Sequence, residues 1–107
     1  MINFIKMSKI TKEELDFRVN CTLSKGRNIA YYRLIDDRPR CQYIHVMRKY
    51  RQEVYELIKF IRDSGMSEMY SSLLVKLNKV IDLISPKIKS DDCFEVAMEL
   101  NKIFNYE

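Results

Sequence analysis

Glycine and proline are scarce in this chain of 107 residues, which contains two of each. Because these residues mark turns and flexible connections, their scarcity favours helices joined by short turns over long loops or linkers. No apolar run approaches the roughly 18 residues that a membrane span requires. No sustained apolar region follows the opening MINFIK, so we expect neither a membrane anchor nor a cleaved secretory signal. Three scattered cysteines do not suggest a disulfide framework, which favours the cytoplasm, with the nucleus as the alternative.

Catalytic and cofactor motifs are also missing. The chain has one histidine, no glycine-rich phosphate loop, no serine nucleophile motif and no pair of carboxylates in an apolar stretch. We therefore expect a protein that is not an enzyme and holds no cofactor. Zinc is the alternative, because Cys41 and His45 are four residues apart, and Cys21 and Cys93 would complete a Cys3His set. Against zinc, no two cysteines are close in sequence, and Cys21 and Cys93 fit patterns of small core residues.

Length and composition are those of one globular domain. Hydrophobic residues make up 47% of the chain and charged residues 32%, which is an ordinary balance for a folded protein. We expect residues 1–107 to form a single domain with one modest core.

Hydrophobic periodicity predicts three helices, at about 41–64, 67–84 and 91–105. Asp36 or Asp37 and Pro39 suit the start of the first helix, and Ser64-Gly65 suits its end. The residue before a proline is disfavoured in a helix, so Ser85-Pro86 ends the second. Three helices with short connections predict a small antiparallel bundle.

The first forty residues follow a different pattern. In LDFRVNCTL the apolar residues alternate strictly, which is typical of a half-buried strand. The stretch SKGRN resembles a turn, so we predict a β-hairpin with strands at about 15–23 and 29–35. The alternative is another helix, for which Thr11 and Glu14 provide a capping box. The predicted class is therefore mainly α, or α+β with the hairpin.

Positive charge is concentrated in residues 18–51, where nine basic residues and two acids give a net charge of +7. The rest of the chain has ten basic residues and thirteen acids, a net charge of −3. Seven of the nine basic residues are arginines, whereas nine of the ten outside, Lys76, Lys79 and Lys102 among them, are lysines. Because arginine binds phosphate with a planar fork and stacks on bases, this segment predicts a nucleic-acid contact surface.

RNA or a ribonucleoprotein, such as a ribosome, is the predicted partner. We find no helix-turn-helix pattern for DNA, and a basic surface with an exposed aromatic suits RNA. Tyr31 and Tyr32 are adjacent, so on a strand at least one of them faces outward. The predicted contact residues are Arg27, Arg33, Arg38, Arg40, Arg48, Lys49, Arg51, Tyr31 and Tyr32.

A second hypothesis belongs to another functional class. Arginine and tyrosine are also favoured at protein–protein interfaces. The same composition therefore fits a helical interaction module, or an inhibitor, that docks on an acidic protein.

Overall fold

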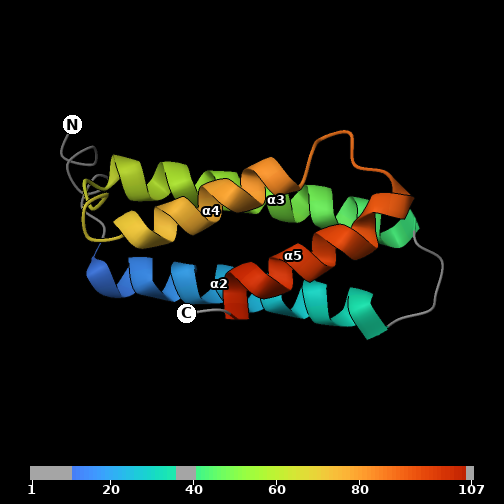
Figure 1. Cartoon of the computed structure of the whole chain (residues 1–107). Coiled ribbons are helices and arrows are strands. Elements are labelled where there is room, and N and C mark those ends of the chain that lie inside the picture. The colour runs from blue at the N-terminus through green and yellow to red at the C-terminus, as the bar shows by residue number, and fades with distance from the viewer. Residues whose placement is uncertain (1–10, 36–40, 106–107) are drawn as a thin grey trace.

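The computed structural model of the chain describes residues 11–35 and 41–105. These residues contain four α-helices: α2 (Lys12–Ile35), α3 (Cys41–Asp63), α4 (Ser71–Leu83) and α5 (Cys93–Asn105). A short 3-10 turn, η1 (Ser90–Asp92), precedes α5. The helices run back and forth as an antiparallel bundle (Figure 1). Both α2 and α4 pack against α3 and α5, so the four helices enclose one core.

The core is built from one apolar stripe on each helix. Leu15 of α2, Tyr50 of α3, Leu77 of α4 and Leu100 of α5 are fully buried. None of the described helices has the length and apolar character that crossing a membrane would require.

The three helices predicted from periodicity are confirmed, with small shifts at their ends. The second begins at Ser71, because residues 67–70 form turns. The third begins at Cys93, because Ser90–Asp92 is the 3-10 turn. Gly65 follows α3 with φ +78°, a left-handed conformation that suits glycine and ends a helix. The proposed start signals at Asp36, Asp37 and Pro39 lie outside the described residues.

The predicted β-hairpin at 15–23 and 29–35 is wrong, because both segments belong to the single helix α2. The alternative, a helix start at Thr11, is the correct one. The Glu14 amide donates to the Thr11 hydroxyl at 3.1 Å, and the Thr11 amide donates to the Glu14 carboxylate at 3.2 Å. This reciprocal pair satisfies two backbone donors that a helix N-terminus otherwise leaves free.

The strand-like alternation has a physical cause in α2. Leu15 and Val19 face the core, whereas Phe17 is 69% exposed and Cys21 is also exposed. The helix therefore carries apolar residues on two opposite faces, which removes the usual one-sided pattern of an amphipathic helix.

Gly26, which suggested a turn, lies inside α2 for a packing reason. A Cβ atom at this position would overlap the Tyr50 hydroxyl and the Phe104 ring. Glycine thus lets side chains of α3 and α5 approach the α2 backbone, where the Tyr50 hydroxyl donates to the Thr22 carbonyl at 2.7 Å.

Candidate binding surfaces

In the part of the arginine-rich segment that the structure describes, the arginine side chains do not all face solvent. Arg33 is only 5% exposed, although it was expected on the surface. Its guanidinium lies over the rings of Tyr43 and Phe94, at 5.3 and 5.4 Å from their centroids. Cation–π contacts of this kind stabilise a buried arginine. The aromatic rings therefore hold Arg33 inside the bundle.

Three further arginines donate hydrogen bonds to backbone carbonyls in other parts of the chain. Arg27 reaches Phe104 at 3.4 Å, Arg48 reaches Ile88 at 3.3 Å, and Arg51 reaches Ile81 at 3.3 Å.

Two of these carbonyls, on Ile81 and Phe104, lie in the last turns of α4 and α5. Carbonyl groups at a helix C-terminus have no hydrogen-bond donor within the helix, and this end of the helix carries a partial negative charge. The arginines therefore connect neighbouring helices, which gives a structural reason for arginine instead of lysine in this segment.

Other residues of the predicted surface are exposed. Lys49 lies on the outside of α3, and Tyr31 and Tyr32 are 57% and 56% exposed on α2. The two tyrosine rings contact each other edge to face, with centroids 5.4 Å apart. Arg27 and Arg48 are also exposed, whereas Arg38 and Arg40 lie outside the described residues.

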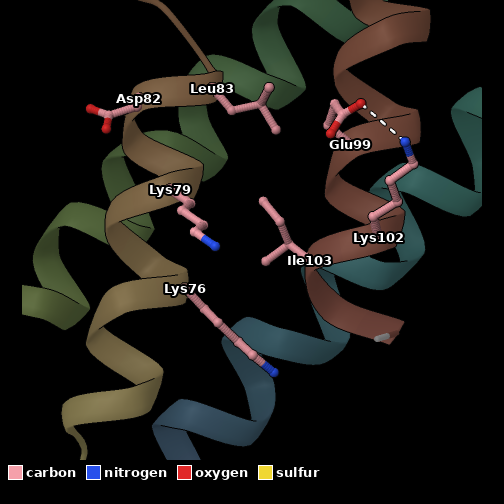
Figure 2. Close-up of a pocket in the computed structure, with 7 residues that line it drawn as sticks. All are labelled: Lys76, Lys79, Asp82, Leu83, Glu99, Lys102 and Ile103. Atoms are coloured by element: carbon pink, nitrogen blue, oxygen red, sulfur yellow. Dashed lines mark hydrogen bonds and ion pairs between the residues drawn. The ribbon is translucent and has the colours of Figure 1, made fainter. Parts of the chain in front are cut away.

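A groove between α4 and α5 forms a concave surface that no pattern in the sequence indicates (Figure 2). Its volume is about 600 Å³. Leu83 and Ile103 approach each other across it, while Lys76 and Lys79 extend from α4 and Asp82 points away. The residues lining the groove are Lys76, Lys79, Asp82, Leu83, Glu99, Lys102 and Ile103.

The groove carries positive charge over an apolar base. Lys102 forms an ion pair with Glu99 at 3.4 Å. Lys76 and Lys79 form no ion pair with any residue that the structure describes. The ammonium groups of Lys76 and Lys79, beside apolar side chains, can bind an acidic group whose apolar neighbours contact Leu83 and Ile103.

A second hollow of about 470 Å³ adjoins the first and shares Leu83 and Glu99 with it. Its charged lining is acidic, with Asp92, Glu95 and Glu99. The path between α4 and α5 therefore changes from basic to acidic along its length. Such a change of sign can fix the direction in which a bound segment lies.

Near the N-terminus of α2, a cluster of polar side chains connects this helix to the turn before α4. Asp16 accepts hydrogen bonds from Lys12 at 2.8 Å and from the Tyr70 hydroxyl. The hydrogen bond from Lys12, followed by that from Tyr70, lowers the pKa of Asp16. The same hydrogen bond to Asp16 raises the pKa of Tyr70. These side chains satisfy one another, so we assign the cluster a structural role.

Among the residues that the structure describes, Cys21, His45 and Cys93 of the zinc alternative do not form a group that could hold a metal ion, and the Cys41 side chain lies outside the described part. Cys21 is exposed on α2, whereas Cys93 is buried, and burial raises the pKa of its thiol. His45 is exposed on α3. Within residues 11–35 and 41–105, no three His, Cys, Asp or Glu side chains are close enough to hold a metal ion.

No protein-family model, curated protein or solved structure matches the chain.

Proposed function

We propose that this protein is a small, non-catalytic helical module that binds an acidic segment of a protein partner in the groove between α4 and α5. The observation that carries the proposal is the groove itself, in which Lys76 and Lys79 flank the apolar pair Leu83 and Ile103. Concave sites of several hundred Å³ with an apolar base and a few charged groups are typical of binding sites.

An amphipathic helix is the occupant that this geometry favours. The groove spans residues 76–83 of α4, which is about 10 Å along a helix. A bound helix places apolar residues at positions i, i+3, i+4 and i+7 over a similar length. Carboxylates beside that apolar stripe would meet Lys76 and Lys79.

Titration with a synthetic peptide tests the proposal. The probe is a 14-residue amphipathic helix with leucine at i, i+3, i+4 and i+7 and with glutamate beside the leucines. Its binding is measured by fluorescence anisotropy. We expect the double variant Lys76→Glu, Lys79→Glu to bind at least about tenfold more weakly, because it replaces attraction by repulsion.

The matched control is Lys49→Glu with Lys59→Glu, which makes the same change of charge on the exposed face of α3. This variant should retain the affinity of the native chain. Equal losses in the two variants would show a nonspecific attraction, and absence of binding by the native chain would overturn the proposal.

RNA binding remains a second candidate. The exposed tyrosines at the end of α2, together with exposed Arg27, Arg48 and Lys49, favour it. An RNA hairpin provides the test. With about four to six phosphate contacts, log K plotted against log salt should have a slope of roughly −3 to −5. The Lys49→Glu, Lys59→Glu variant would then lose RNA affinity, whereas a slope near zero would exclude the phosphate contacts.

A further inference from the structure

The outward face of α2 carries no charge over most of its length. Its six outermost positions follow one another at alternating spacings of four and three residues. All six are exposed, and they are Phe17, Cys21, Ser24, Asn28, Tyr31 and Ile35. We call this set the α2 stripe. The outward face of a surface helix normally holds its charged residues.

The contrast with α3 shows how unusual the α2 stripe is. The outer positions of α3 are exposed and mostly charged or ionisable, namely His45, Arg48, Gln52, Glu56, Lys59 and Asp63. The α2 stripe instead presents large apolar side chains to solvent. Phe17, Tyr31 and Ile35 are 69%, 57% and 59% exposed.

The basic residues of α2 point away from the α2 stripe. Lys25 forms an ion pair with Glu53 of α3 at 2.8 Å, and Arg27 donates to the Phe104 carbonyl of α5. Arg18 lies over the Phe60 ring of α3 at 4.1 Å. The flanking helices therefore draw these cations to the two sides, and the α2 stripe between them remains neutral.

The α2 stripe is complementary to itself when reversed about Gly26. In an antiparallel pair of α2 helices, Phe17 lies opposite Ile35, and Cys21 lies opposite Tyr31. Ser24 lies opposite Asn28, so each end of the contact is apolar and the centre pairs a hydroxyl with an amide. Alternating spacings of four and three residues are those of knobs-into-holes packing, and a central polar layer can fix the register.

We propose that two copies of this chain associate through their α2 stripes, antiparallel and about a two-fold axis near Gly26. Such an axis makes every contact occur twice, as in an isologous dimer. The contact runs from Phe17 to Ile35, about 27 Å along the helix. Since α4 lies across the bundle from α2 and does not contact it, the dimer leaves the groove between α4 and α5 free. This inference does not depend on the proposed function.

Molar mass in solution tests the association. The native chain should sediment with twice the 12.9 kDa mass of one chain at high concentration and dissociate on dilution. The double variant Phe17→Glu, Tyr31→Glu should remain monomeric, because it places four carboxylates in the contact. Both side chains are exposed in the single chain, so circular dichroism should be unchanged. The control Tyr55→Glu changes an aromatic on α3 that is 54% exposed and should still dimerise.

Cross-linking tests the register, in a Cys41→Ser background. The variant Tyr31→Cys should form a disulfide-linked dimer on mild oxidation through the native Cys21 of the other copy. Within one chain these positions are about 15 Å apart along the helix, too far for a disulfide. Adding Cys21→Ser should abolish the cross-link.

Several results would overturn this inference. A native chain that stays monomeric at high concentration would do so, as would a Tyr31→Cys cross-link that persists without Cys21, since that is the signature of a parallel pair. If the α2 stripe variants lost binding to the RNA hairpin while the native chain stayed monomeric, the α2 stripe would be an RNA-binding face instead.

Discussion

Gly26 occupies the middle of a 24-residue helix, where a glycine costs about 0.5–1 kcal/mol relative to alanine. Its replacement by alanine should nevertheless destabilise the protein, because the new methyl group would overlap Tyr50 and Phe104. Overpacking of this kind costs about 1–3 kcal/mol, which exceeds the gain in helix propensity. Urea denaturation at fixed protein concentration measures the difference.

The control is Asn20→Ala, an exposed position on the same helix. Here no side chain is displaced, so the better helix propensity of alanine should leave the stability equal or slightly higher. A Gly26→Ala protein as stable as Asn20→Ala would contradict the packing role of this glycine.

Tyr50 should make stability depend on pH in the alkaline range. Burial, with a smaller effect of the nearby Glu53, raises the pKa of Tyr50 in the folded state. The phenol of the unfolded chain ionises near pH 10. The stabilisation that the neutral, buried Tyr50 gives to the fold is therefore complete below about pH 10 and is lost as the pH rises further. The unfolding free energy of the Tyr50→Phe variant should therefore fall less steeply above about pH 10. At neutral pH this variant should be about 1 kcal/mol less stable than the native chain, because it lacks the hydrogen bond to the Thr22 carbonyl.

Unfolding free energies at several pH values provide the measurement, and Tyr55→Phe is the matched control because Tyr55 is exposed. If the native chain and Tyr50→Phe showed parallel pH profiles, the ionisation of Tyr50 would not be linked to unfolding.

Arg33 shows why the exposure of a charged side chain is hard to predict from sequence. Arg33 follows the buried Ile29 and Ala30 at helical spacing, but Phe94, one of the two rings that it contacts, is sixty-one positions away. A long side chain with an apolar stem can be buried or exposed according to such distant partners. Charge reversal at this position would test the fold more than any binding surface.

At the scale of single elements, the capping box at the start of α2 should contribute measurably to stability. Thr11→Ala removes the hydroxyl that accepts from the Glu14 amide, and loss of an N-cap costs about 0.5–2 kcal/mol. Hydrogen exchange at the amides of the first turn should accelerate accordingly. Thr11→Ser retains the hydroxyl and should behave like the native chain, whereas equal exchange in both variants would argue against the cap.

A helix is easier to predict from sequence when its apolar residues lie on one face only. α3 has a single buried stripe, so its periodicity predicts its bounds to within a residue. α2 has apolar residues on both faces, and the resulting alternation resembles a strand. The capping signal at Thr11 was the local information that identified the helix correctly. An exposed apolar face is therefore both the reason for the error and the basis of the proposed dimer.

For the whole molecule, the two proposed surfaces should act independently. The groove lies between α4 and α5, whereas the α2 stripe consists of exposed residues of α2, a helix that does not pack against α4. We expect titration calorimetry to show one acidic peptide per chain in the dimer. The monomeric variant Phe17→Glu, Tyr31→Glu should bind with the same affinity. A changed affinity or half-occupancy would show that the surfaces communicate.

The groove could not be predicted from the sequence, because it arises from the packing of α4 against α5. Lys76, Lys79 and Lys102 have the spacing of ordinary exposed lysines and lie outside the basic segment. Only the tertiary arrangement places them around Leu83 and Ile103 (Figure 2). By contrast, the enrichment of residues 18–51 in arginine is visible in the sequence itself. It could not show that several of these arginines bind backbone carbonyls of distant elements.

The packing of α2 against α5 also bears on synthesis of the chain. α2 leaves the ribosome before the other described helices, and α5, which covers much of its inner face, leaves last. Until then, a nascent chain exposes apolar residues on both sides of α2, which is the kind of surface that chaperones recognise. A chain interrupted after α4 would keep that inner face open, with Gly26 and its neighbours accessible to proteases.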